Sequence, residues 1–290
     1  MANGSVKLKA ADIRRYNYLT NEKNERLCAI DCHEDKFVLA SEFPDSEMKR
    51  QCQKMNILEL VNNSIQLSVR VEVRLTEPSQ GRNQLQESVP EMYSKFKNVV
   101  MPHTGSGIIK DIYTNESSSE SQVEVCTAMH VVFNDEEAKN TKCSLYFDGE
   151  GYRTVILTGI NESGSNISSD WCKFLCKVDS QKIDEIKENF KKFETELGNK
   201  KRKKMNRKRK VILISHPHGG YKYISMGDQI IEKDGIRYDT PSCKGCSGGY
   251  IIPVGYIDKG TYVHSGSSYE NGKRMYGYAS GLIPVVKHGQ

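Results

Sequence analysis

The chain has 290 residues, 37% of them hydrophobic, a length that allows two domains of roughly 150 residues or one large β domain with an extension. No apolar run approaches the ~20 residues of a membrane-spanning helix or the length of a secretory signal, so we expect a cytoplasmic or nuclear protein without membrane or secretory segments. The net charge of +5 depends on residues 200–210, which hold nine of the 42 Lys and Arg; the remainder carries −4, which argues against a uniformly basic nucleic-acid-binding fold.

The first 85 residues predict an N-terminal extension of mixed α and β structure. A short strand is expected at residues 36–40, and a helix is expected to start near Ser46. Apolar residues at every second position from 64 to 76 predict a strand with one buried face. The polar stretch at 77–87 is typical of a linker.

Beyond residue 90, short β-rich segments alternate with Gly- and Ser-rich joints, and the joints at 114–122 and 161–169 are typical of loops. Many short strands at this spacing predict a sandwich or a barrel. The expected strands lie at 105–113, 122–133, 142–147, 152–159 and 171–178.

One helix interrupts the strands. Its apolar residues fall at spacings of three and four, which gives a narrow apolar stripe. Asp179 or Ser180 suits the N-cap, and Gly198 suits the C-terminal end. The basic tract follows directly, and strand patterns resume at 211–215 and continue to the end of the chain. The stripe consists of Ile183, Ile186, Phe190, Phe193 and Leu197.

The loop Gly245-Cys246-Ser247-Gly248-Gly249 carries the first candidate for catalysis. A serine between glycines is often only a hairpin turn, but glycines also allow a tight turn that lifts the hydroxyl outward. Such a turn lets the amides of Gly245 and Ser247 point at a developing oxyanion. The loop also matches the G-x-S-x-G elbow of α/β-hydrolases, which need an acid and a histidine after the serine. The 43 residues after Ser247 carry only strand and turn patterns, so the elbow is disfavoured.

Two residues upstream complete a candidate catalytic set. His130 ends a strand-like apolar run, where a histidine is also often an ordinary core side chain. Asp170 opens an apolar strand, where an acid can simply cap the strand. The order His130, Asp170, Ser247 is the one that the chymotrypsin fold uses. Rival acids are Asp148, Asp179 and Asp184.

Together these segments resemble the trypsin-like serine peptidases. TAMH at 127–130 resembles the histidine motif of that family, DWCKFL at 170–175 its aspartate strand, and CKGCSGG at 243–249 its serine loop. Residues 102–108 and 212–220 are similar to strands of intracellular, high-temperature-requirement-like members. The resemblance implies a chymotrypsin-like fold that is mostly β, with two antiparallel barrels, an inserted helix and an α+β N-terminal extension.

The resemblance also divides the chain. An extension at 1–85 precedes a trypsin-like protease domain at 86–290. Within that domain, the first barrel is expected at about 97–180, the helix and basic insertion at 181–210 and the second barrel at 211–290. The catalytic cleft is expected between the barrels, with the histidine and aspartate from the first and the serine from the second.

The roles that the resemblance implies are those of a serine endopeptidase. Ser247 would attack the scissile carbonyl, and His130 would take its proton and later give it to the leaving amine. Asp170 would orient His130, and the amides of Gly245 and Ser247 would bind the oxyanion. This chemistry needs no cofactor and no metal. The predicted substrate contacts are Lys244 and a strand similar to one that pairs with a substrate backbone, with His264, Ser265 and Gly266.

The cysteines give a second set of expectations. Nine cysteines without a secretory signal predict reduced thiols. Cys243 and Cys246 form a C-x-x-C motif, but no βαβ unit is visible to support a thioredoxin-like function. A zinc site could use Cys172 and Cys176 as further ligands, but the spacing of this pair is not matched elsewhere in the chain, which disfavours zinc. Cys246 stands where secreted members have an aspartate, so we expect no activation by N-terminal cleavage. We expect oxidation that links Cys243 to Cys246 to silence the enzyme.

The basic tract from Lys200 to Lys210 leaves three interpretations open. It is a solvated loop, a signal bound by a nuclear import receptor, or a contact with the phosphate backbone of a nucleic acid. The other expected partner is a protein or peptide substrate. The alternative to an enzyme is a catalytically silent, protease-like scaffold that binds protein or nucleic acid.

Overall fold

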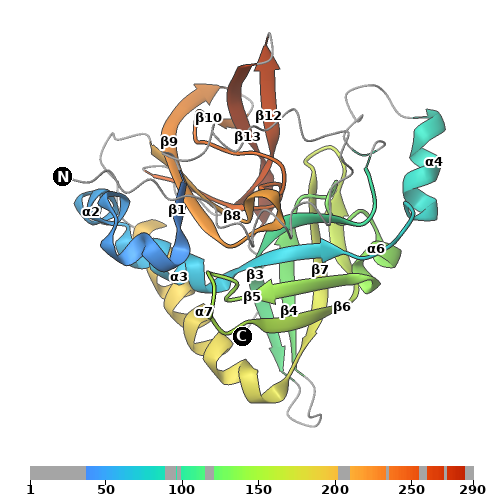
Figure 1. Ribbon diagram of the computed structural model, residues 1–290, viewed down its shortest axis with the longest axis horizontal. Helices are drawn as coiled ribbons and strands as arrows, with labels where there is room; N and C mark the ends of the chain where they lie inside the picture. Colours follow the sequence, from blue (N-terminus) through green and yellow to red (C-terminus); the bar gives the residue numbers. More distant parts are fainter. Residues whose placement is uncertain are drawn as a thin grey trace.

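Two closed antiparallel β-barrels of six strands each make up most of the computed structural model (Figure 1). Their strands confirm the predicted fold class, mostly β with two chymotrypsin-like barrels. The first barrel has the strand order β2 (Ser68–Val73), β3 (His103–Thr114), β4 (Ser121–Thr127), β7 (Trp171–Val178), β6 (Val155–Asn166) and β5 (Thr141–Leu145). The second has the order β8 (Lys210–Ser215), β9 (Tyr223–Glu232), β10 (Gly235–Tyr238), β13 (Lys273–Pro284), β12 (Gly260–Glu270) and β11 (Tyr250–Pro253), and β9 pairs with β8 to close it. The structure describes residues 37–88, 96, 99–114, 121–201, 210–232, 235–254, 260–270 and 273–284.

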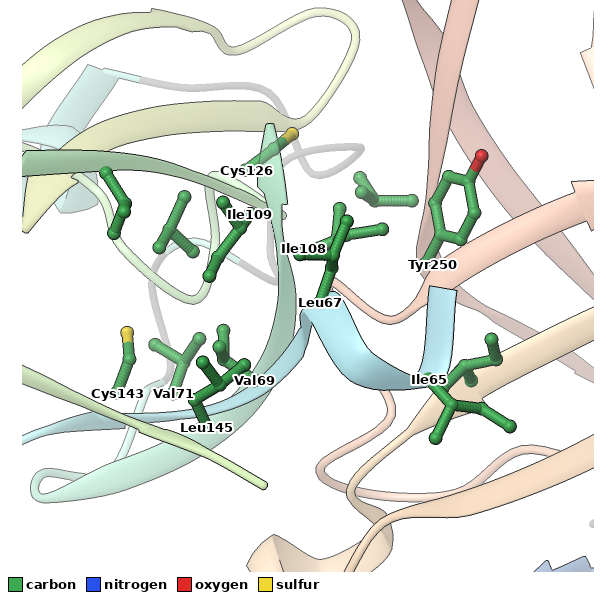
Figure 2. Close-up of a cluster of buried hydrophobic side chains, with 14 of the residues drawn as sticks. Ile65, Leu67, Val69, Val71, Ile108, Ile109, Cys126, Cys143, Leu145 and Tyr250 are labelled. Carbon is green, nitrogen blue, oxygen red and sulfur yellow. The ribbon is translucent and has the colours of Figure 1, made fainter. Parts of the chain in front are cut away.

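Alternating side chains form the barrel interiors. In β7 every second residue from Cys172 to Val178 is buried, while Lys173 and Lys177 lie on the outer face. Figure 2 shows the same principle in β2 and β5, where Val69 and Val71 lie beside the side chains of the opposite strand inside the first barrel.

The segment at 1–85 does not lie wholly outside the barrels. β1 (Phe37–Leu39) pairs with β9 of the second barrel, and β2 pairs with both β3 and β5 of the first. The first barrel therefore begins at Ser68 rather than near residue 97, and the expected boundary at residue 85 falls inside it. Without β2 the edges of β3 and β5 would have unpaired backbone groups, so the barrel requires this strand to close.

The expected strand at 64–76 is partly wrong. Ile65 and Leu67 belong to the helix α3 (Leu58–Leu67), and the strand begins only at Ser68. Helical spacing places Val61 on the same buried face of α3 as Ile65, and α3 packs against the long helix α7 (Ser180–Lys201). Both periodicities bury Ile65, so the pattern alone does not separate helix from strand at this point.

Two segments expected as linker or loop are ordered by contacts with distant parts of the chain. The polar stretch at 77–87 contains the helix α4 (Gln80–Ser88), whose Arg82 is fully buried beside α6 (Asp135–Lys139). The expected loop at 161–169 is largely the second half of β6, which pairs with β7 as far as Asn166. Polar composition predicted loops here because the stabilising partners are not local.

Three other local predictions are confirmed, whereas α7 continues past Gly198, its expected end, and β4 ends at Thr127 rather than near residue 133. The expected strand at 36–40 is β1, and α2 (Glu47–Lys54) begins after Ser46, whose hydroxyl accepts a hydrogen bond from the Lys49 amide at 3.1 Å. A 3-10 helix, η3 (Ala40–Asp45), joins these two elements. The apolar stripe of the predicted long helix lies on α7.

A continuous apolar core connects the two barrels. It runs from the interior of the first barrel to Ile212, Ile214 and Tyr250 of the second. Figure 2 shows Ile65 on α3 close to Tyr250, and Leu67 between Tyr250 and the first-barrel side chains. Phe193 of α7 packs edge-to-face against Tyr250, with ring centroids 5.9 Å apart. This shared core sets the position of the loops that face each other between the barrels.

Some sequence expectations extend beyond the described residues. In the ranges given above, none of the helices is long and apolar enough to cross a membrane, and none of the cysteines is in a disulfide. Cys28 and Cys32 lie outside these ranges. Residues 202–209 also lie outside them, so the three interpretations of the basic tract stay predictions.

Candidate active site

His130 and Asp170 are brought together by two neighbouring strands. His130 follows the end of β4, and Asp170 immediately precedes β7, while Thr127 and Cys172 are directly paired across these strands. The Nδ1 atom of His130 lies 2.9 Å from Oδ2 and 3.1 Å from Oδ1 of Asp170. The backbone N–H of His130 donates to Oδ1 at 3.0 Å. One carboxylate therefore holds both the ring and the backbone of His130.

The Asp170 carboxylate is also held from the second barrel. The hydroxyl of Ser265, on β12, donates a hydrogen bond to Oδ2 of Asp170. The Asp170 side chain is only 4% exposed, whereas that of His130 is 15% exposed. A carboxylate acceptor at Nδ1 favours the tautomer with the proton on Nδ1, which leaves Nε2 able to accept a proton. Chemically, such a pair can serve as a general base with a buried orienting acid.

The loop that carries Ser247 lies beside this pair. The carbonyl of Ser247 accepts a hydrogen bond from the Ser106 amide at 2.7 Å. A Cβ atom on the neighbouring Gly105 would lie 2.5 Å from Val131 and 3.0 Å from the Ser247 carbonyl oxygen. Gly105 thus touches both the residue after His130 and the serine itself. Among the described residues, no hydrogen bond joins the Ser247 hydroxyl to the His130 ring.

Two glycines of the loop have conformations that other residues rarely adopt. Gly245 has φ 84° and Gly248 has φ 81°. A Cβ atom on Gly248 would lie 2.1 Å from Ser106 O and from Thr127 Oγ1, so only glycine fits there. The amides of Gly245 and Ser247 find no acceptor among the described residues. Two such amides could donate to an oxyanion; their role in an oxyanion hole stays a prediction.

The strand predicted to contact substrate also supports the serine loop. His264 accepts a hydrogen bond from the Gly248 amide at 2.7 Å and donates its own amide to Gly249 O at 2.8 Å. Its ring is buried, with Nδ1 2.5 Å from the hydroxyl of Tyr238. His264 is therefore occupied in holding the loop through its backbone. The predicted substrate contacts that remain accessible are Lys244, which is exposed, and Gly266, which is half-buried.

Two residues that the sequence analysis did not single out help to fix this site, and one of them, Ser106, connects the barrels. The Ser106 hydroxyl donates to Gly245 O at 2.7 Å and accepts from the His216 amide at 2.8 Å. The Nε2 atom of His103 lies 2.7 Å from the Val131 carbonyl, and burial lowers the pKa of His103 to about 4. A neutral His103 can donate to this carbonyl and fix the loop after His130. The segment 102–108 was predicted only as a barrel strand.

The rival acids lie elsewhere. Asp148 is buried and its Oδ1 lies 2.7 Å from Nζ of Lys222. Asp179 accepts a hydrogen bond from the Gln181 amide at the start of α7, and Asp184 is 91% exposed. None of these hydrogen bonds and ion pairs reaches His130, so Asp170 is the acid that the structure joins to it.

Cys246, directly before Ser247, is fully buried and close to Cys243. Its Sγ atom lies 4.0 Å from Cys243 Sγ and 3.3 Å from the Ser215 hydroxyl. Burial raises the pKa of the Cys246 thiol, but hydrogen bonds from Cys243 and Ser215 outweigh burial and bring the pKa to about 7. This position therefore holds a buried thiol rather than the aspartate of secreted peptidases.

In the described residues, no three His, Cys, Asp or Glu side chains lie together as a metal site would need. The chain matches no protein-family model, and no curated protein matches it significantly. What the fold and the contacts establish is a two-barrel, chymotrypsin-like architecture with a His130–Asp170 pair beside a glycine-rich serine loop.

Proposed function

We propose that the protein is a serine endopeptidase that hydrolyses peptide bonds through His130, Asp170 and Ser247. The observation that supports it most is the contact of 2.9 Å between His130 Nδ1 and Asp170 Oδ2, between the barrels of a chymotrypsin-like fold. The third group, Ser247, lies on a loop bonded to the strand that contacts Asp170. Histidine, acid and serine occur in the chain order of that fold.

The proposed reaction has two stages. The Ser247 oxygen attacks the carbonyl carbon while His130 Nε2 takes the hydroxyl proton, and the amides of Gly245 and Ser247 donate to the resulting oxyanion. Collapse of this intermediate breaks the C–N bond, and His130 gives its proton to the leaving amine. Water then attacks the acyl-enzyme with His130 again as base, which releases the acid product and restores Ser247. Asp170 stays ionised and stabilises the charged imidazole.

The finer assignments are also proposals. We place the protein among intracellular, high-temperature-requirement-like peptidases on the resemblance of residues 102–108 and 212–220. We propose a cytoplasmic or nuclear location and a protein or peptide substrate. The basic tract is proposed as a solvated loop, a signal bound by an import receptor or a nucleic-acid contact.

The test is covalent labelling by a fluorophosphonate probe, which reacts with an activated serine. Full-length protein is expected to be labelled, and Ser247→Ala is expected to lose labelling while unfolding at the same temperature. Ser163→Ala, which removes an exposed serine on β6, is the matched control and should label at the wild-type rate. Labelling that persists in Ser247→Ala would contradict the proposed nucleophile.

One observation favours a second function, a catalytically silent scaffold. The Ser247 hydroxyl makes no hydrogen bond to the His130 ring among the described residues, although such bonds are often loose without substrate. A folded wild-type protein that fails to label would support the scaffold. A salt-sensitive nucleic-acid shift that is lost when residues 200–210 are deleted would identify its ligand.

Oxidation is expected to inactivate the proposed enzyme reversibly. Hydrogen peroxide would convert the thiols of Cys243 and Cys246 to a disulfide, with release of two molecules of water. Their sulfur atoms, now 4.0 Å apart, must approach to about 2 Å. This movement displaces Gly245, which lies between them and carries an oxyanion amide. We expect probe labelling to fall at least tenfold and to return after reduction, with the disulfide identified by mass spectrometry.

The matched variant for this experiment is Cys243→Ser. It should label like wild type before oxidation and keep its labelling afterwards, because Cys246 has lost its partner. Unchanged labelling of a wild-type protein whose disulfide has been verified would disprove the link between the thiols and the oxyanion loop.

A further inference from the structure

We propose that Arg82 is a positioning residue for catalysis, which acts by fixing the loop that carries His130. The proposal rests on the function proposed above. Arg82 lies on α4, a helix beside α6 at the outer side of the first barrel in Figure 1, yet its side chain is fully buried. Its guanidinium Nη2 donates to the backbone carbonyl of His130 at 3.2 Å. The sequence predicted only a linker here.

The same guanidinium holds the other end of the loop through Glu137. Nε of Arg82 donates to Glu137 Oε1 at 2.7 Å, and Nη2 donates to Oε2 at 2.6 Å. Oε2 of Glu137 in turn accepts the amide of Phe133 at 2.9 Å. One bidentate ion pair thus fixes the carbonyl of His130 and the amide of Phe133, three residues apart.

Arg82 also holds the aromatic residue that packs against the His130 ring. Nη1 donates to the carbonyl of Phe96 at 3.2 Å. The ring of Phe96 meets the imidazole of His130 edge-to-face, with centroids 6.3 Å apart. His130 is therefore held through both its backbone and its ring. Its N–H and Nδ1 contact Asp170, its carbonyl contacts Arg82, and its ring meets that of Phe96 edge-to-face.

The energetics of this ion pair favour a role in orientation over one in stability. Both side chains of the pair are 0% exposed. Burial raises the pKa of Glu137, but Arg82 outweighs burial and holds it below its ordinary value, so the pair is charged. Moving two charges out of water costs about as much as their attraction returns, and apolar residues of equal volume often stabilise a protein better. What apolar residues cannot supply is a directed hydrogen bond to the His130 carbonyl.

The test compares two variants of the full-length protein by the kinetics of fluorophosphonate labelling. Arg82→Lys keeps a charge for Glu137 but cannot reach three acceptors at once. The double variant Arg82→Met with Glu137→Leu removes both buried charges at similar volume, so that neither charge is left unpaired. We expect the limiting labelling rate to fall about 10- to 100-fold in both, because small misplacements of a reacting group cost that much. The probe concentration at half-maximal rate should stay within about twofold, since its binding surface is unchanged.

The split between rate and affinity distinguishes positioning from a merely structural role. A structural defect would reduce the fraction of protein that labels at the end point, but not the rate per labelled site. Arg153→Lys, in an Arg–Glu pair on the surface, is the matched control and should behave as wild type. If wild type labels and both variants keep its rate per site, this proposal is wrong. If wild type itself fails to label, the proposed function is wrong.

Discussion

Asp170→Asn is expected to reduce the rate of probe labelling by roughly four orders of magnitude while the protein stays folded. The carboxylate oxygens of Asp170 accept hydrogen bonds from the amide and Nδ1 of His130 and from the Ser265 hydroxyl. The asparagine side chain keeps one of these oxygens as an acceptor and has an NH2 group, which only donates, in place of the other. Pointed at His130, that donor favours the tautomer with the proton on Nε2, which cannot act as a base toward Ser247.

Asparagine is the substitution of choice because of the backbone at this position. Asp170 has φ 47°, in the left-handed region that Asp and Asn tolerate better than other residues with a side chain. Alanine would add backbone strain to the loss of charge, and the two effects would be confused. Asparagine changes the charge and one hydrogen-bonding atom while it keeps shape and backbone.

The labelling rate is measured over long incubations, because it is expected to be slow, and the melting temperature is measured alongside it. Asp179→Asn is the matched control, since Asp179 accepts from the Gln181 amide at the start of α7 and asparagine caps a helix equally well. This control should label at the wild-type rate. Labelling of Asp170→Asn at the wild-type rate would remove Asp170 from the proposed mechanism.

The strands were predictable because their pattern is local. β7 buries Cys172, Phe174 and Cys176 in strict alternation, and this pattern appears in the sequence without knowledge of any partner. α4 was not predictable for the opposite reason. Its ordering contact is the burial of Arg82 against Glu137, which lies 55 positions later in the chain. Polar composition at 77–87 gives no signal of such a contact.

The residues of the candidate site also fall into those that the sequence predicted and those that depend on distant contacts. His130 and Asp170 lie at the ends of strands whose resemblance to a known family predicted their roles, and the structure joins them directly. The contribution of Ser106, which bonds to both Gly245 and Ser247 from the other barrel, depends on how two barrels meet. The spacing of residues in the sequence does not predict how the two barrels pack against each other. A serine preceded and followed by glycine in β3 was the one available hint, because Gly105 and Gly107 mark close backbone approach.

A chain that begins at residue 86 is expected not to fold, although the sequence predicted a protease domain there. It would lack β2, which pairs along its whole length with β3 and from Val69 to Val73 with β5. Val69, Val71 and Val73 of this strand are fully buried, as are Leu60, Val61 and Leu67 of α3. Burial of each such side chain contributes about 1.5–3 kcal/mol. Loss of all six is comparable to the entire net stability of a domain, about 5–15 kcal/mol.

The loss of this segment also leaves a buried charge with fewer partners. Nζ of Lys222, in the second barrel, donates to the Ile65 carbonyl at 2.7 Å and pairs with Asp148. Burial lowers the pKa of Lys222, and the carbonyl of α3 is one of the groups that satisfy its ammonium. Truncation therefore destabilises both barrels, not only the one that β2 closes.

The truncated and full-length chains are to be compared by gel filtration and by thermal unfolding followed with circular dichroism. The full-length chain should elute as a discrete species and unfold cooperatively, and the truncated chain should aggregate or unfold without a transition. Val71→Asp in the full-length chain tests the same strand without deletion, because it places a charge inside the barrel. Glu72→Gln, on the outer face of β2, is its matched control. A truncated chain that unfolds cooperatively would show that the edges of β3 and β5 can close on each other, and the first barrel would then need only five strands.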